Sequence, residues 1–231
     1  MNFNMTTVNP ETILFLKNLY SNNNREWFNE NKDKYLIAQS NMIQFADQLL
    51  SEMNKHDVLE NESGKKSLYR IYNDVRFSKD KTPYNARFSC GLKRAGKWRR
   101  GGYYLQISPG DHFLACGFFA PNKVDLTRIR QDIDVNTEEW AKILNNKEIR
   151  IHFGDLKGTK VPTTPRSYSK DHPAIELLRY KQFFLRHDFK ETEVLSVNFI
   201  QNVDHIFRAV RPFFDYMSIV LTTNSNGESI V

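Results

Sequence analysis

The sequence predicts an α+β fold in which an antiparallel sheet of about four to six strands packs against N-terminal and C-terminal helices. Three observations predict this class. Apolar residues recur every three or four positions near both ends of the chain, which is the spacing of amphipathic helices. From about residue 67 to residue 120 the period changes to two, which is the spacing of strands. Short turns with Gly or Pro join these strands, as in an antiparallel meander.

The first elements are expected to be helices. Asn9-Pro10-Glu11 is typical of a helix start, with Asn at the cap and Pro in the first turn, and this helix is expected to end near Tyr20. The apolar positions between Arg25 and Met53 predict one long amphipathic helix. A polar loop follows, and the sheet begins after it.

Four strands are expected in the middle of the chain, near 68–77, 86–93, 102–108 and 112–119. The second half is expected to mix both element types. Its expected elements are a helix at 124–133, a second helix after a capping-box-like sequence at 136–139, a strand at 148–153, an irregular segment at 154–170, a helix at 171–181, a strand at 183–189 and helices at 194–221 that Pro212 interrupts.

Length and composition indicate one globular domain over 1–231, with an ordered core at about 9–222. The chain has 40% hydrophobic residues and no convincing linker. No stretch approaches the ~18 apolar residues of a membrane span, and the start lacks the pattern of a signal peptide. Cys90 and Cys116 lack metal-ligand spacing, so free buried thiols in a cytoplasmic protein are expected.

The positive charge is concentrated in one part of the sequence. Between Gly64 and Gly101 there are twelve basic and two acidic residues, a net charge of +10, so the rest of the chain carries −4 of the total of +6. A local field of this kind attracts phosphates, nucleic acid or other anions. The alternative is a solvated basic surface with no specific partner.

The strand expected at 68–77 would have two different faces. Its apolar face would carry Tyr69, Ile71, Val75 and Phe77, and its other face Arg70, Tyr72, Asp74 and Arg76. A charged turn, Lys79-Asp80-Lys81, follows before Thr82-Pro83. Because the arginine fork suits carboxylates and phosphates, this segment is the first candidate ligand site, and its candidate residues are Arg70, Asp74, Arg76, Lys79, Asp80 and Lys81.

Two further residues are candidates for the same ligand site. Arg130 is expected to point inward from a short helix. His172 lies in Asp171-His172-Pro173 at an expected helix start, where it could act as an acid, a base or a ligand. The structural alternative is that Asp171 simply caps the helix.

Several classes of site find no support in the sequence. There is no Gly-rich phosphate loop, no nucleophile elbow, and no His, Cys, Asp or Glu cluster with metal spacing. No metal and no cofactor are therefore expected. Asp74 and Asp80 are surrounded by cations, which disfavours a two-metal nuclease site.

The charged motif also carries a resemblance to a known family. The sequence from Arg70 to Tyr84, RIYNDVRFSKDKTPY, resembles a bacterial and fungal family known as domain of unknown function 2461. The resemblance extends in order from about Phe15 to Phe214. Asn85 stands where the family commonly has Lys. The resemblance implies a shared fold and a shared site, and it implies no activity.

Three functions remain open at the level of the sequence. The first is binding or turnover of a small anionic ligand, phosphate- or carboxylate-bearing, in a cationic pocket. The second is nucleic-acid binding by the basic hairpin residues Lys93, Arg94, Lys97, Trp98, Arg99 and Arg100, where a Trp lies among cations. The third is a protein-interaction or structural role, in which the charged row is an ion-pair network without a ligand.

Overall fold

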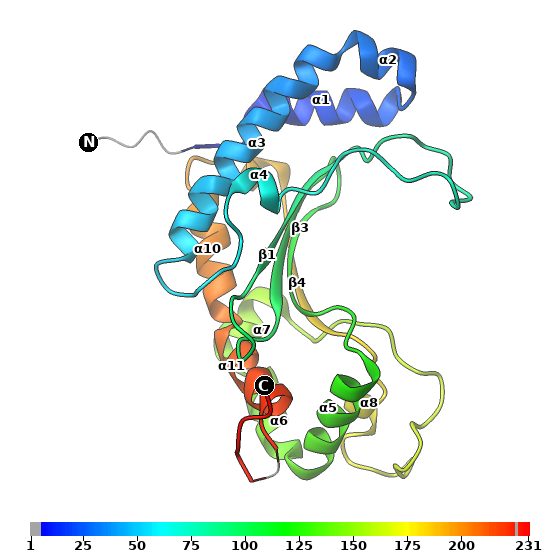
Figure 1. The fold of residues 1–231 in the computed structure, drawn as a ribbon, viewed down its shortest axis with the longest axis vertical. Coiled ribbons are helices and arrows are strands. Elements are labelled where there is room, and N and C mark those ends of the chain that lie inside the picture. Colours follow the sequence, from blue (N-terminus) through cyan, green and yellow to red (C-terminus); the bar gives the residue numbers. More distant parts are fainter. Residues whose placement is uncertain (1–5, 225) are drawn as a thin grey trace. The chain divides into compact units, whose positions relative to one another are not determined.

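The structure is a computed structural model that describes residues 6–224 and 226–231. It is an α+β fold with an open four-stranded antiparallel sheet, in the order β1-β2-β3-β4 (Figure 1). This confirms the expected fold class. The strands are β1 (Phe88–Lys93), β2 (Gly102–Ile107), β3 (His112–Phe118) and β4 (Phe183–Phe189).

Helices precede the sheet, lie between its third and fourth strands, and follow it in the sequence. They are α1 (Pro10–Ser21), α2 (Arg25–Glu30), α3 (Lys32–Met53), α4 (Gly64–Ser67), α5 (Lys123–Val135), α6 (Thr137–Leu144), α7 (Lys147–Phe153), α8 (Ile175–Leu178), α9 (Glu191–Val194), α10 (Phe199–Ala209) and α11 (Arg211–Thr222). Among the described residues, no helix has both the length and the apolar character that a membrane crossing requires.

The chain divides into two compact units, which are described separately. Unit 1 comprises Met1–Lys93, Tyr104–Leu114 and Asp188–His205. Unit 2 comprises Arg94–Tyr103, Ala115–His187 and Ile206–Val231. The expectation of one domain over the whole chain stays a prediction.

The core of unit 1 forms where α1, α3 and α4 bury their apolar sides. Phe45 of α3 is fully buried and its ring centroid lies 5.7 Å from that of Phe199. A buried amide joins two helices: Asn41 Oδ1 accepts a hydrogen bond from Thr12 Oγ1 at 2.9 Å and one from the Asn9 backbone N–H at 3.0 Å. Asn9 therefore stands at the start of α1 as expected, but its side chain makes no capping bond.

The core of unit 2 is built around aromatic rings. Trp140 of α6 is fully buried, with its ring centroid 6.1 Å from that of Phe183 on β4 and 6.3 Å from that of Phe213 on α11.

Both expected thiols are buried and free, and burial raises the pKa of Cys90, in unit 1, to about 12. A thiol with a pKa this high is a core group rather than a nucleophile.

Four expected elements differ from the structure. One of them, the helix expected at 171–181, is only α8 and is described with the candidate site. The expected long helix breaks at Asn31, whose side chain donates to the Trp27 carbonyl, so α2 and α3 are separate. The strand expected at 148–153 is the helix α7. Ile149 and Phe153, four residues apart, are both buried while Ile151 is 63% exposed, which is a helical and not a strand pattern.

The remaining difference concerns the strand expected at 68–77. This segment makes only two isolated antiparallel bridges, Leu68 with Cys90 and Tyr72 with Tyr84. The expected apolar face is not buried as a face, since Ile71 is 2% exposed and Phe77 is 95% exposed. The residues after Tyr72 bond within their own loop, so they have no neighbouring strand to pair with.

Candidate functional site

The segment with the family motif forms a loop in unit 1, which we call the charged loop (residues 70–82). It extends away from the strands and returns to them (Figure 1). Two backbone hydrogen bonds close its base, from the Asn73 N–H to the Pro83 carbonyl at 2.9 Å and from the Asn85 N–H to the Ile71 carbonyl at 2.7 Å. The Asn73 side chain also donates to the Thr82 carbonyl at 2.9 Å. The loop is therefore held in shape by its own backbone.

Aromatic rings anchor the base of the charged loop. The rings of Phe28 and Tyr84 stack with centroids 3.9 Å apart, and Tyr72 lies 5.5 Å from Tyr84. Lys32 Nζ donates to the Tyr72 hydroxyl at 2.7 Å and lies over the Tyr72 ring. Asn23 donates to the Tyr84 carbonyl at 2.8 Å. Asn23 and Tyr84 both lie within the range of the family resemblance.

Asp74 and Arg76 form a bidentate pair on the charged loop. Arg76 Nε donates to Asp74 Oδ1 at 2.9 Å, and Arg76 Nη2 donates to Oδ2 at 2.6 Å. This hydrogen bonding, with a smaller contribution from the charge of Arg70, lowers the pKa of Asp74. The side chains are 76% and 41% exposed for Arg76 and Asp74. The strand face that was expected to carry these residues is therefore wrong. Asp74 and Arg76 still meet, whereas Arg70 acts on Asp74 only through its charge.

The turn at the far end of the loop also satisfies its own carboxylate. Asp80 Oδ1 accepts hydrogen bonds from the Thr82 N–H at 2.9 Å and the Thr82 hydroxyl at 2.5 Å, and these bonds lower the pKa of Asp80. Lys81 Nζ donates to the Val75 carbonyl at 2.9 Å. Both acids of the loop are thus ionised and engaged within it.

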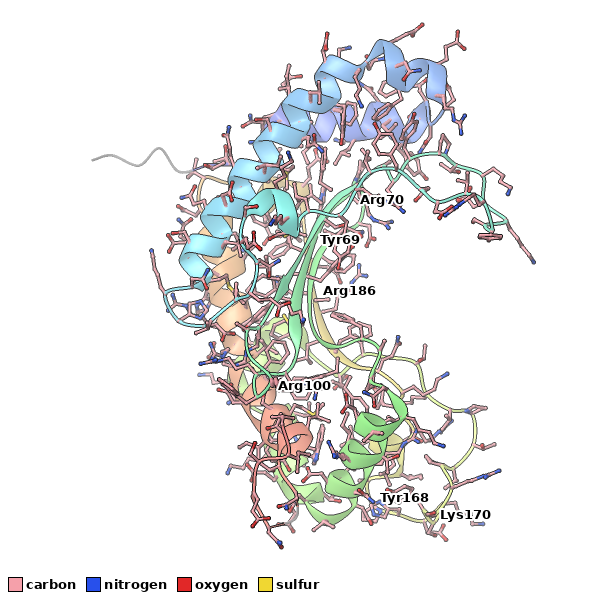
Figure 2. All side chains as sticks on the ribbon, in the orientation of Figure 1. Tyr69, Arg70, Arg100, Tyr168, Lys170 and Arg186 are labelled. Atoms are coloured by element: carbon pink, nitrogen blue, oxygen red, sulfur yellow. The ribbon has the colours of Figure 1, made fainter. Side chains whose placement is uncertain are left out.

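Two cations of the loop remain available. Arg70 and Lys79 are exposed, and within the described chain neither makes a hydrogen bond or a close ion pair. Figure 2 shows Arg70 beside Tyr69, where the chain leaves the sheet. The loop thus presents two free cations while its carboxylates are already paired. That arrangement favours an added anion.

The structure places Arg130 and His172 in unit 2, where each bonds to groups of the protein. Arg130 Nε donates to the Leu178 carbonyl at 2.9 Å, and burial lowers the pKa of Arg130. His172 Nε2 lies 2.9 Å from Asp134 Oδ1, and Nδ1 accepts the Ala174 N–H at 3.0 Å. Both ring nitrogens are therefore engaged, which supports a structural role for His172 rather than an acid or base role.

The helix expected to start at Asp171 begins later. The helix α8 has Ala174 at its N-cap, and the Asp171 side chain does not cap it. The His172 ring accepts the N–H of the cap residue instead. Tyr168, on the preceding irregular segment, has a pKa that burial and the charge of Asp134 raise.

The basic hairpin is not a row of free cations. Arg94 is 3% exposed, and its Nη2 donates to Asp215 at 2.9 Å. Arg100 Nη2 donates to Asp125 at 2.5 Å. The guanidinium of Arg94 is buried in unit 2, which disfavours Arg94 as a nucleic-acid contact. Trp98 is 60% exposed, and Lys93 pairs with Glu60 at 2.7 Å in unit 1.

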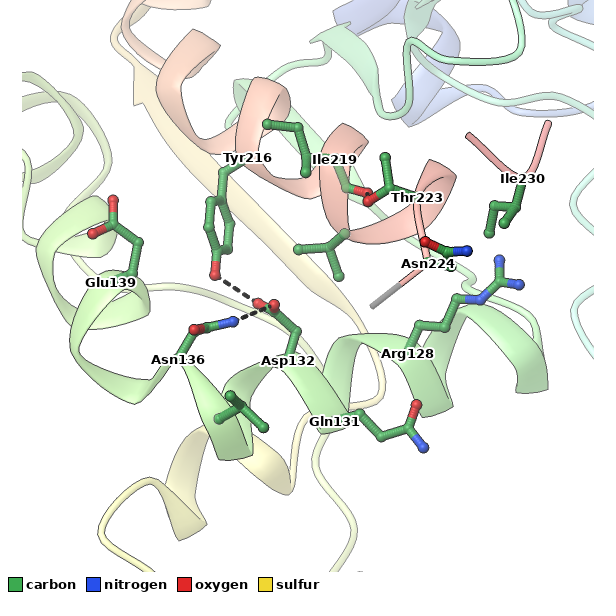
Figure 3. A pocket seen from close by; sticks show the side chains of 12 residues that line it. Arg128, Gln131, Asp132, Asn136, Glu139, Tyr216, Ile219, Thr223, Asn224 and Ile230 are labelled. Atoms are coloured by element: carbon green, nitrogen blue, oxygen red, sulfur yellow. Dashed lines mark hydrogen bonds between the residues drawn. The ribbon is translucent and has the colours of Figure 1, made fainter. Parts of the chain in front are cut away.

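Unit 2 also contains a pocket of about 810 Å³ that the sequence did not indicate (Figure 3). It lies between α5, α6 and α11. Asp132 on its wall accepts hydrogen bonds from the Tyr216 hydroxyl at 2.6 Å and the Asn136 side chain at 2.7 Å. Asp132 is thus occupied by protein donors, and the polar wall is a structural network.

Because of the hydrogen-bond network on the pocket wall, the free energy of unfolding is expected to fall at alkaline pH. Burial, and then the hydrogen bond to Asp132, raise the pKa of Tyr216. Its stabilising contribution is complete below the ordinary tyrosine pKa of about 10 and is lost as the pH rises toward the folded-state value. Urea unfolding at rising alkaline pH should show this loss in the wild type and a smaller one in Tyr216→Phe. Equal losses would assign the effect to other tyrosines, such as Tyr35, whose pKa burial also raises.

Sequence reasoning missed the aromatic residues on the sheet of unit 1. The ring of Tyr69 lies against Gly91 of β1, and Tyr104 of β2 follows beside it. The available signal was the mixed face of the strand at 102–108, where Tyr104 and Gln106 alternate with apolar residues. The single Gly inside β1 was a second signal.

These features define an α+β protein with an open antiparallel sheet and a charged loop at its family motif. The chain belongs to the family described as "Conserved hypothetical protein (DUF2461)", which it matches over residues 11–216. The expected resemblance is thereby confirmed. No curated protein and no solved structure matched the chain.

Proposed function

We propose that the charged loop binds a small anionic ligand that bears a phosphate or a carboxylate. The observation that carries the proposal is the pair Arg70 and Lys79. Both are exposed, and neither has a hydrogen bond or a close ion pair within the described chain. The two acids of the same loop are already bound by Arg76 and Thr82. An incoming anion therefore meets cations whose acidic neighbours are already engaged.

The loop is prepared for binding by its own contacts. The backbone bonds at its base and the Asp80–Thr82 turn fix its course before any ligand arrives. Binding then requires less ordering of the backbone, which is a cost that flexible loops carry in full. On this proposal the expected cationic pocket is an exposed loop, which would hold the ligand from one side.

The test is calorimetric titration of the full chain with inorganic phosphate and with citrate at low ionic strength. The double variant Arg70→Ala/Lys79→Ala should bind at least about tenfold more weakly, because it removes two charge-assisted contacts. The matched control is Lys123→Ala/Lys147→Ala, which changes the net charge equally with exposed lysines of unit 2. Equal loss in both would mean that net charge alone attracts the anion.

The interaction role remains the second candidate, and Phe77 favours it. This ring is 95% exposed in the middle of the charged loop, with the Arg76 guanidinium 5.9 Å from its centroid. If the wild-type chain binds neither phosphate nor citrate, a protein contact made through this ring becomes the better account of the loop.

A further inference from the structure

A row of three aromatic rings crosses the sheet in unit 1. Tyr69 precedes β1, Tyr104 belongs to β2 and Phe113 to β3. The ring centroids lie 6.0 Å apart for Tyr69 and Tyr104, and 5.6 Å apart for Tyr104 and Phe113. Tyr69 is 60% exposed, and the other two are half-buried. We call these three residues the ring row.

The ring row lies on the face of β1 opposite its core residues. Phe88, Cys90 and Leu92 are buried on the side that packs against α3 and α4. Ser89 and Gly91 face the other way, where Ser89 is buried and Gly91 is half-buried. Helices therefore cover one face here. Aromatic rings left on the other face of a sheet indicate a surface that contacts something else.

Contacts with β1 fix the position of Tyr69. Its N–H donates to the Ser89 carbonyl at 2.9 Å, which fixes its backbone beside the strand. A Cβ atom at Gly91 would lie 2.8 Å from the Tyr69 hydroxyl oxygen and 3.2 Å from Cε2. Only a glycine leaves room for this ring, and a glycine inside a strand often marks such an approach.

Two cations are close to the ring row in the sequence. Arg70 directly follows Tyr69 and begins the charged loop, and the exposed Arg87 directly precedes β1. An aromatic surface beside a guanidinium matches a ligand that joins a planar ring to an anion. Open antiparallel sheets stack nucleobases on aromatic side chains in this way.

We infer that the ligand of the charged loop is a nucleotide, with its base stacked on Tyr69 and Tyr104 and its phosphate held by Arg70. This inference rests on the proposed function, because it assigns the phosphate to the same loop. The small number of available cations favours a nucleotide over a nucleic-acid strand. The loop has four basic residues, of which Arg76 and Lys81 are engaged within it. A nucleic-acid strand would need a longer row of free cations along its phosphates.

The test compares three ligands on the full chain: adenosine 5′-monophosphate, ribose 5-phosphate and inorganic phosphate. Stacking should make the nucleotide bind about tenfold more tightly than ribose 5-phosphate. Tyr104→Leu should remove this difference and leave the affinity for ribose 5-phosphate unchanged. Gly91→Ala should do the same by displacing the Tyr69 ring, whose hydroxyl end can move aside. The control is Tyr20→Leu, a 74% exposed tyrosine of α1 that should change neither affinity.

The outcomes separate this inference from the proposed function. Equal affinity for the nucleotide and for ribose 5-phosphate would overturn the ring-row assignment and leave anion binding by the loop intact. Failure of all three ligands would overturn the proposed function and the inference together. Much tighter binding of a short single-stranded oligonucleotide than of the nucleotide would overturn the nucleotide assignment in favour of a nucleic-acid strand.

Discussion

Gly117→Ala is expected to lower the free energy of unfolding by about 3 kcal/mol, at the upper end of the cost of overpacking. Gly117 lies on β3 with φ +152°, a conformation that residues with a Cβ rarely adopt. An added Cβ would lie 2.5 Å from the Phe184 Cα of β4 and would also overlap the Phe183 carbonyl oxygen. These are backbone atoms of the neighbouring strand, so relief requires the strands to separate. Urea unfolding followed by circular dichroism measures the loss.

Gly110→Ala is the matched control for this prediction. Gly110 also has a positive φ, +76°, but no heavy atom lies within 4 Å of an added Cβ. Its cost should be the backbone strain alone, about 1–2 kcal/mol. A similar loss in both variants would show that the close approach of β3 to β4 does not decide the stability of unit 2.

The sheet is the part of the fold that the sequence predicts best. The strands expected at 86–93, 102–108, 112–119 and 183–189 all form within about two residues of those limits. Each has alternating apolar positions, and the first three are joined by short turns. Strand period and turn chemistry are local signals, so one sequence is enough to read them.

The failures occur where a local pattern fits two structures. Ile149, Ile151 and Phe153 alternate like a strand, but Ile149 and Phe153 also stand four apart like a helix. The Asn146 side chain decides between them, because it accepts hydrogen bonds from the N–H groups of Glu148 and Ile149 and starts α7. Tertiary contacts then bury the helical face.

The charge pattern of the sequence located the candidate site, but the predicted strand there is a loop. The spacing correctly brought Asp74 and Arg76 together, since residues so near in sequence meet in most extended or looped backbones. A strand forms only where a neighbouring strand can pair with it. The residues that follow Tyr72 have no such neighbour, and a local sequence pattern cannot reveal this. The ring row was missed for a related reason: Tyr69, Tyr104 and Phe113 meet only through the order of the strands.

Asp132→Ala should lower the free energy of unfolding by about 3 kcal/mol, because it leaves three donors without their acceptor. Asp132 accepts hydrogen bonds from Trp140 Nε1 at 2.7 Å, the Tyr216 hydroxyl at 2.6 Å and Asn136 Nδ2 at 2.7 Å. Tyr216 and Asn136 can turn toward water. Trp140 is fully buried, so its N–H cannot, and a buried unpaired donor accounts for most of the cost.

Asp134→Ala is the matched control, two residues along the same helix. Asp134 is 48% exposed and pairs with His172, so its loss should cost little. The comparison isolates the buried donor, because both variants remove one carboxylate from α5. Asp132→Asn keeps an acceptor oxygen for Trp140 and should fall between the two. If Asp132→Ala is no worse than Asp134→Ala, water has replaced the carboxylate beside Trp140, and the pocket wall is open to solvent.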